Sequence, residues 1–113
     1  IVNISSVAHY SYSGNGAALY AITKTAVARM TDALSLEWAK YGINVNAICP
    51  GMFKTEMLDG MLERVGDLSQ HVVRKRICDP AQMDSTLLYL VSPASECVTG
   101  AVIRVDDGQS ARN

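Results

Sequence analysis

The stretch 17–41 contains no glycine or proline and lies between two short apolar runs, an arrangement that constrains the fold more than any other feature. The runs 1–4 and 43–49 are rich in β-branched residues, as is typical of strands buried in a parallel sheet. Apolar residues recur at helical spacing between them, and Gly42 is a natural helix stop. We therefore predict one long helix between two buried strands. Its inward stripe should be Ile22, Ala26, Met30 and Ala33, widened by Val27, Leu34 and Trp38.

The rest of the chain continues this alternation of strands and helices. Residues 5–16 should form a loop, and residues 53–76 should hold two short helices of a mobile flap. Asp79-Pro80 is typical of a helix start, so we expect a helix over 80–91 and a third strand over 101–105. Crossovers of this length imply parallel strands with right-handed connections, and hence an α/β fold class. The inward residues of the second long helix should be Met83, Leu87, Leu88 and Val91.

The charge balance and the cysteine pattern exclude several classes of protein. A net charge of −1 gives no electrostatic reason to bind nucleic acid or acidic membranes, and no apolar run is long enough to span a bilayer. The basic cluster 74–76 should be a solvated face. The three cysteines are odd in number and far apart, which favours a reduced, cytoplasmic protein without disulfides or a metal site.

Tyr20 and Lys24 are the first candidates for chemistry. A phenol is a poor acid or base near neutral pH, but a lysine ammonium on the same helix face favours its ionised form. Ser6 ends the first apolar run, and its hydroxyl could hold a substrate carbonyl between itself and the tyrosine. Such a set can provide general acid–base catalysis for the interconversion of a carbonyl and an alcohol, with a bound cofactor carrying the hydride.

Five groups of motifs follow one another in an order that resembles a known family. They are Ile1-Val2-Asn3-Ile4-Ser5-Ser6, Tyr20-Ala21-Ile22-Thr23-Lys24, Gly42-Ile43-Asn44-Val45-Asn46-Ala47-Ile48-Cys49-Pro50-Gly51, Thr55-Glu56-Met57, and Val98-Thr99-Gly100 with Val105-Asp106-Asp107-Gly108. Together they resemble the C-terminal half of a short-chain dehydrogenase/reductase. The resemblance implies the C-terminal part of a doubly wound parallel Rossmann-type sheet. Residues 1–113 would be the catalytic half of one dinucleotide-binding domain, without the half that carries the phosphate loop.

By the same resemblance, three residues carry the catalysis. Tyr20 would be the acid/base, and Lys24 would favour its phenolate and hydrogen-bond the nicotinamide ribose of NAD or NADP. Ser6 would orient the carbonyl, with Ser5 as the rival for that role. The segment that holds the nicotinamide carboxamide would include Pro50, Gly51, Phe53 and Thr55, although an ordinary strand-ending turn is an alternative for Pro50-Gly51.

The substrate implied by the resemblance is a secondary alcohol or its ketone. Ala8, His9 and Tyr10 follow Ser6 in the loop and are candidate substrate contacts. Met57 could line an apolar pocket, although core packing explains it nearly as well. The turn at Asp106-Asp107-Gly108 departs from the usual Asp-Gly-Gly, which puts its conformation in doubt.

Two classes of function stay open. The first is an oxidoreductase that moves a hydride between NAD(P) and an alcohol or ketone. The second is a non-catalytic fragment or scaffold, because the strand 1–4 would present an apolar edge without a neighbouring strand. The helix 17–41 resembles one that packs across a two-fold axis in family tetramers, so we expect a homodimer or homotetramer. No nucleic-acid or membrane partner is expected.

Overall fold

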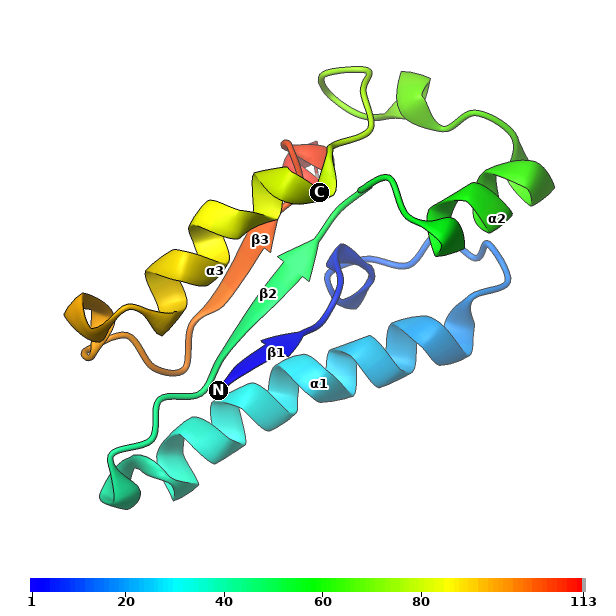
Figure 1. Cartoon of the computed structure of the whole chain (residues 1–113). Helices are drawn as coiled ribbons and strands as arrows, with labels where there is room; N and C mark the ends of the chain where they lie inside the picture. Colours follow the sequence, from blue (N-terminus) through cyan, green and yellow to red (C-terminus); the bar gives the residue numbers. More distant parts are fainter. Residues whose placement is uncertain (113) are drawn as a thin grey trace.

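The computed structural model describes residues 1–112 and has three parallel strands flanked by helices (Figure 1). The strands β1 (Val2–Ile4), β2 (Asn46–Pro50) and β3 (Val102–Val105) lie side by side in that order. Asn3 pairs with Ala47 across β1 and β2, and Ile48 pairs with Ile103 across β2 and β3. The α/β fold class with three parallel strands is confirmed.

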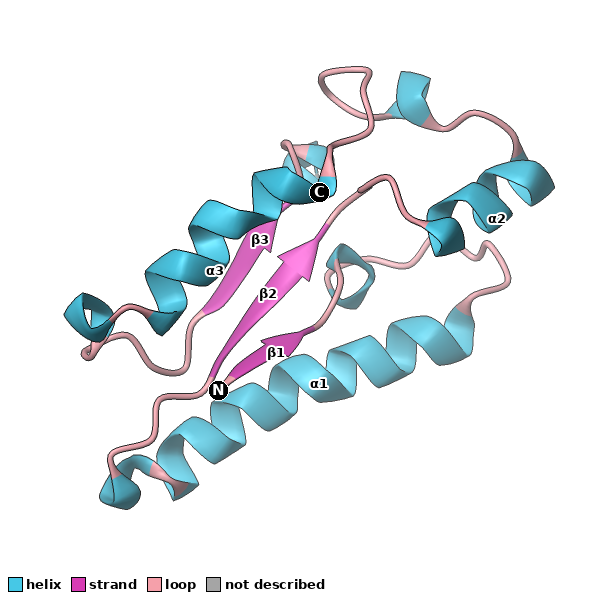
Figure 2. Cartoon of the chain, in the orientation of Figure 1, coloured by secondary structure: helices cyan, strands magenta, loops and turns pink. Residues whose placement is uncertain are grey.

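Figure 2 shows the helices that connect and follow these strands. They are α1 (Ala18–Glu37), α2 (Glu56–Val65) and α3 (Asp84–Val91). A single 3-10 turn extends α1 to Gly42, whose φ of 68° ends it as predicted. In the flap, the second predicted helix is only a short 3-10 turn, Ser69–His71. Within residues 1–112, no helix combines the length and the apolar character needed to cross a bilayer.

The core is centred on β2. Val45, Ala47, Ile48 and Cys49 have no exposed surface, which agrees with the prediction of a strand buried on both faces. Asn46, the polar residue among them, donates to the Val98 carbonyl at 2.8 Å and accepts from the Ala101 N–H at 2.9 Å. A buried amide that makes both bonds ties β2 to the segment before β3.

The helices α1 and α3 cover opposite faces of the sheet. The Asn3 side chain donates to Thr31 of α1 at 3.1 Å, whereas Val2 points to the other face and lines a hollow there with Leu90 of α3. Both connections move in the same direction across the sheet, from β1 to β2 to β3. Because their helices lie on opposite faces of the sheet, the two connections have opposite hands. The prediction that both are right-handed is therefore wrong for one of them.

The predicted inward stripes of both long helices are wrong. Small side chains form the buried side of α1, namely Ala21, Ala28, Thr31 and Ser35, because they allow the helix to approach the sheet closely. The predicted stripe of α1 is largely exposed; Ile22, for example, is 65% exposed. In α3 the buried residue is Leu90, and of the predicted set Leu87, Leu88 and Val91 are exposed while Met83 is half-buried.

Candidate active site

The two serines after β1 are both buried, and their hydroxyl groups have different partners. Ser5 Oγ donates to the Lys24 carbonyl at 2.7 Å, which ties this loop to α1. Ser6 Oγ accepts from the Ala8 N–H at 3.1 Å and so caps the 3-10 turn Val7–His9. The hydroxyl proton of Ser5 is therefore used within the fold, whereas the bond to Ala8 leaves the Ser6 proton able to reach a ligand.

Tyr20 and Lys24 lie in the first two turns of α1, and both are half-buried. Lys24 Nζ lies 5.7 Å from the centroid of the Tyr20 ring. The same Nζ donates to the Ile4 carbonyl at 3.1 Å, at the C-terminal end of β1. The structure thus brings Tyr20 and Lys24 to the edge of the sheet where the loop 5–16, called the serine loop below, begins. Ligands of open α/β sheets bind at this edge.

Cys49 lies beside the serine loop, a contact that the sequence reasoning missed. Its thiol is fully buried, and burial raises its pKa. The Ser5 side chain, the Ser6 backbone and the Tyr10 side chain are its polar neighbours, and they oppose part of this rise in the pKa. Because Ile4 pairs with Ile48, the next pair in register is Ser5 with Cys49. Strand register is thus the signal that could have revealed this contact.

His9 and Tyr10 pack the serine loop against the sheet. Their ring centroids are 3.7 Å apart, and the Arg104 guanidinium of β3 lies 5.2 Å from the Tyr10 centroid. Burial and the neighbouring Cys49 raise the pKa of the Tyr10 phenol. Burial lowers the pKa of His9, whose Nε2 is buried without a hydrogen-bond partner within the described part of the chain. A contact of either ring with a substrate stays a prediction.

The predicted substrate residues do not line one common hollow. Ala8 lines a shallow apolar hollow of about 340 Å³ beside the start of α1, with Tyr12, Ala18, Ala21, Ile22 and Thr25. His9 and Tyr10 do not belong to that lining, and Met57 is exposed on α2. Its exposure argues against the alternative that Met57 serves core packing.

Gly51 and Thr55, in the segment after β2, each have a structural role. A Cβ on Gly51 would lie 2.7 Å from Asp106 Cβ and 2.8 Å from Asp106 Cα, so no larger residue fits against that turn. Thr55 caps α2 by accepting from the Leu58 N–H at 3.2 Å. Pro50 is the last residue of β2. These contacts account for Gly51 by packing, and they leave the cofactor role of the segment to be tested.

Phe53 presents its main chain to the open side of this segment. Its ring is buried, and it forms an isolated parallel bridge with Cys78. The hydrogen bonds of the bridge run from Lys54 N–H to the Cys78 carbonyl and from Cys78 N–H to the Met52 carbonyl, both at 2.9 Å. Because successive peptide groups of an extended chain alternate in direction, the N–H and C=O of Phe53 itself point away from Cys78. One donor and one acceptor thus lie side by side.

Comparison with known proteins decides the family. The family model described as Enoyl-(Acyl carrier protein) reductase matches residues 1–110 of this chain. The chain belongs to the short-chain dehydrogenase/reductase family.

Individual members of this family match over nearly the whole chain. A tropinone reductase homolog of Arabidopsis thaliana is 36% identical over 96% of this chain and 42% of its own length. A meso-2,3-butanediol dehydrogenase of Serratia marcescens is 32% identical over 98% of this chain and 44% of its own length. Among solved structures, an actinorhodin polyketide ketoreductase variant with NADPH superposes with a TM-score of 0.89 at 31% identity, over 96% of this chain and 46% of that one.

The short-chain dehydrogenase/reductase chain therefore spans somewhat less than half the length of the relatives it matches. Membership of the family implies a nicotinamide dinucleotide cofactor, and the neighbouring ketoreductase structure was solved with NADPH. Residues 1–112 contain the serine loop, the helix α1 with Tyr20 and Lys24, and the segment after β2.

Proposed function

We propose that this chain supplies the acid–base half of an oxidoreductase that transfers a hydride between NAD or NADP and a secondary alcohol or its ketone. The observation that carries the proposal is the position of Lys24. Its ammonium reaches the Ile4 carbonyl at the start of the serine loop and lies 5.7 Å from the Tyr20 ring. A cation and a phenol thus lie at the sheet edge where the loop that carries the Ser6 hydroxyl begins, and these three groups would suit proton transfer to a carbonyl oxygen.

The residues present fit a nicotinamide dinucleotide. The Phe53 N–H and C=O point away from Cys78 and form a donor–acceptor pair, which is complementary to a carboxamide. The Thr55 hydroxyl accepts from the Leu58 N–H and keeps its own proton for donation. The Lys24 ammonium is the proposed donor to the ribose hydroxyl groups. When bound, the nicotinamide supplies or accepts the hydride.

The protein groups move one proton. In the reducing direction, the hydroxyl groups of Ser6 and Tyr20 donate hydrogen bonds to the substrate carbonyl oxygen and orient it. As the carbonyl carbon gains a hydride, Tyr20 gives its proton to that oxygen, and an alcohol forms. The Lys24 ammonium stabilises the phenolate that remains on Tyr20. Oxidation of the alcohol reverses each of these transfers.

The substrate class draws on the relatives. The names of the three relatives above include a tropinone reductase homolog, a butanediol dehydrogenase and a ketoreductase, all of which refer to carbonyl or alcohol chemistry. The loop residues Ala8, His9 and Tyr10, with Met57 on the flap, are the proposed substrate contacts. His9 Nε2 is a polar atom in this loop without a partner inside the described structure, and a substrate hydroxyl could satisfy it.

A labelled hydride tests the proposal. The natively expressed protein is incubated with a panel of ketones and with NADH or NADPH deuterated at the transferable position. Mass spectrometry should find one deuterium on the alcohol carbon with one of the two cofactors. A protein that binds neither cofactor and labels no product would contradict the proposal. That outcome would favour a non-catalytic scaffold. The supporting observation is the exposure of Ile1, just before β1, and of Ile4, its last residue.

We further propose that α1 packs against a second copy of this protein to give a homodimer or homotetramer. The outer face of α1 carries large apolar side chains that nothing covers within residues 1–112, namely Leu19, Ile22, Met30 and Leu36. Several large apolar side chains exposed along one helix are typical of a subunit interface. Its counterpart on a second copy would be the same face, as in any two-fold contact.

A further inference from the structure

Lys75 and Asp107 are the non-glycine residues with a left-handed backbone among residues 1–112, and one ion cluster joins Asp107 to the two neighbours of Lys75. The φ angle is 51° at Lys75 and 52° at Asp107. Lys75 stands between Arg74 and Arg76, and both arginines pair with the Asp107 carboxylate. Residues other than glycine rarely adopt this backbone conformation because it is strained. The strain persists where surrounding contacts hold the residue in place.

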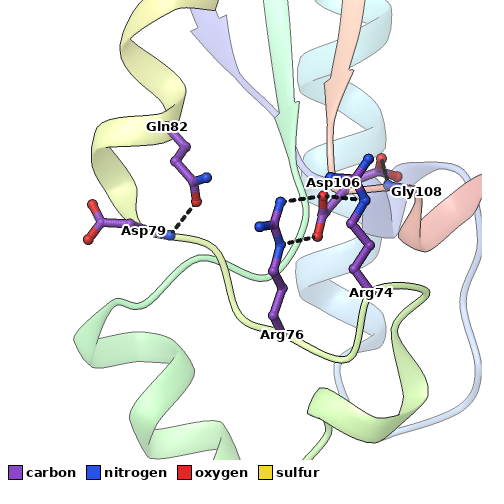
Figure 3. Close-up of polar contacts among 7 residues, drawn as sticks. Arg74, Arg76, Asp79, Gln82, Asp106 and Gly108 are labelled. Carbon is purple, nitrogen blue, oxygen red and sulfur yellow. Dashed lines mark hydrogen bonds and ion pairs between the residues drawn. The ribbon is translucent and has the colours of Figure 1, made fainter.

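Arg76 makes a bidentate contact with the Asp107 carboxylate. Arg76 Nε donates to Asp107 Oδ2 at 2.7 Å, and its Nη2 donates to Oδ1 at 2.9 Å. Arg74 Nε lies 3.5 Å from the same Oδ1, and Figure 3 shows both arginines reaching toward the turn after β3. The Asp107 side chain is only 12% exposed. Paired hydrogen bonds between a guanidinium and a carboxylate fix orientation, unlike an ordinary exposed ion pair.

Asp106 and Asp107 have separate tasks. The Asp106 carboxylate accepts from the Gly108 N–H at 3.1 Å, from the Ser110 N–H at 2.9 Å and from the Ser110 hydroxyl, so it closes its own turn. Asp107 instead binds the flap. Glycine would adopt the same φ without strain. A carboxylate at this position is therefore explained by the arginines that it binds and not by the shape of the turn.

The ion cluster is connected to the main chain around Phe53. Arg76 stands two residues before Cys78, the partner of Phe53 in the parallel bridge. On the other side of the cluster, Gln109 stands two residues after Asp107 and accepts from the Met52 N–H at 3.2 Å. The turn after β3 thus holds the segment 52–54 directly through Gln109 and indirectly through Arg76 and Cys78.

The chain is also fixed just beyond the bridge. The Asp79 carboxylate accepts from the Ala81 N–H at 2.8 Å. The Gln82 side chain accepts from the Asp79 N–H at 2.9 Å, as Figure 3 shows. This capping box anchors residues 79–82 at the start of the helical region that leads into α3. The returning segment of the flap, residues 74–78, is thus held on both sides. The capping box holds the chain just after Cys78, and Asp107 holds the two arginines before it.

We propose that Asp107, with Arg76 and Arg74, is a positioning residue for the dinucleotide site. The ion cluster anchors the returning segment of the flap, and through the Cys78 bridge it holds the Phe53 main chain in the orientation that a carboxamide requires. This inference rests on the function proposed above. An ordinary surface ion pair would leave the segment 52–54 unaffected when broken, so the two accounts differ in a measurable property.

The test compares two variants of Asp107 with a matched control in the natively expressed protein. Asp107→Asn removes the charge but keeps the shape, and Asp107→Gly removes the contact while relaxing the turn. Glu63→Gln removes one carboxylate from an exposed position on α2 of the same flap. Amide hydrogen exchange of segments 52–54 and 74–78 is measured without cofactor, and the dissociation constants of NADH and NADPH are measured separately.

We expect both Asp107 variants, and not Glu63→Gln, to accelerate exchange in these two segments and to weaken the preferred cofactor by about fivefold. Unchanged exchange in both variants would overturn the proposed anchor. Faster exchange with an unchanged dissociation constant would overturn its link to the cofactor. If the unmodified protein bound neither cofactor, the proposed function would fail, while the exchange data would still decide whether Asp107 anchors the flap.

Discussion

The side chain of Lys24 donates to the Ile4 carbonyl at 3.1 Å, at the end of β1 where the serine loop begins. The Lys24 carbonyl in turn accepts from Ser5 Oγ at 2.7 Å. The lysine is thus held to the strand end by its side chain and by its main chain. Such a double attachment places a positive charge beside the phenol of Tyr20 without requiring a ligand.

Removal of this charge should reduce turnover. Lys24→Met keeps most of the apolar stem, but it leaves the Tyr20 phenolate without a cation, so we expect kcat/KM to fall by about 100-fold or more. Lys40→Met, in the 3-10 turn after the same helix, is the matched control and should retain activity. Steady-state kinetics with the preferred cofactor make the comparison. Equal losses in the two variants would contradict a role for Lys24 at the site.

The two serines should respond differently to loss of their hydroxyl groups. Ser6→Ala removes a donor to the substrate carbonyl, so kcat should fall by about 100-fold. Ser5→Ala removes a buried hydrogen bond that ties the loop to the Lys24 carbonyl, so the free energy of unfolding should fall by about 1–2 kcal/mol. Thermal melts and kinetics of both variants separate these effects. A larger loss of kcat in Ser5→Ala than in Ser6→Ala would exchange their roles.

A charge on the outer face of α1 should disrupt self-association. Leu36 is 80% exposed within this chain, and Leu36→Lys would place an ammonium in the proposed contact between copies. Glu37→Lys, at the neighbouring exposed position, is the control for added positive charge. Light scattering at several concentrations should show a smaller assembly for Leu36→Lys alone. The same mass for all three proteins would place the interface elsewhere.

Acid should release the flap through Asp107. Hydrogen bonding to Arg76 lowers the pKa of Asp107 below its ordinary value, so its contribution to stability is present above the ordinary carboxylate pKa and is lost as pH falls through the lowered value. Asp106 titrates nearby; although burial opposes the shift, hydrogen bonds from Ser110 and Gly108 lower its pKa too. The difference in flap proteolysis between the unmodified protein and Asp107→Asn therefore isolates Asp107. That difference should disappear in acid and be constant near neutral pH; a difference that persisted in acid would contradict the assignment.

The order of strands and helices could be predicted because its signals are local. The β-branched run before Ser5 and the glycine at the end of the helical region depend only on neighbouring residues. The buried side of α1 could not be predicted in this way. Ala28 and Thr31 face the sheet because they are small, whereas the larger Met30 is exposed. Hydrophobic periodicity does not distinguish an apolar face that contacts its own sheet from one that lies outside it.

Contacts between distant segments were the other part that the sequence did not reveal. The pairing of Ser5 with Cys49 depends on strand register, and the pairing of Arg76 with Asp107 joins residues 31 positions apart. The basic cluster 74–76 is exposed, as predicted for a solvated face, and two of its three side chains also bind a mostly buried carboxylate that the sequence did not reveal. The departure from Asp-Gly-Gly at Asp107 was visible in the sequence, although its partner was not.

The most direct measurement of the central claim is the turnover of Tyr20→Phe beside Tyr41→Phe. Tyr41 is an exposed tyrosine at the far end of the same helical region, so its variant controls for loss of a phenolic hydroxyl. We predict that Tyr20→Phe loses turnover by about 1,000-fold or more, while its dissociation constant for the preferred cofactor and its melting temperature stay unchanged. Tyr41→Phe should behave like the unmodified protein. Retention of turnover by Tyr20→Phe would contradict the assignment of Tyr20 as the acid and base.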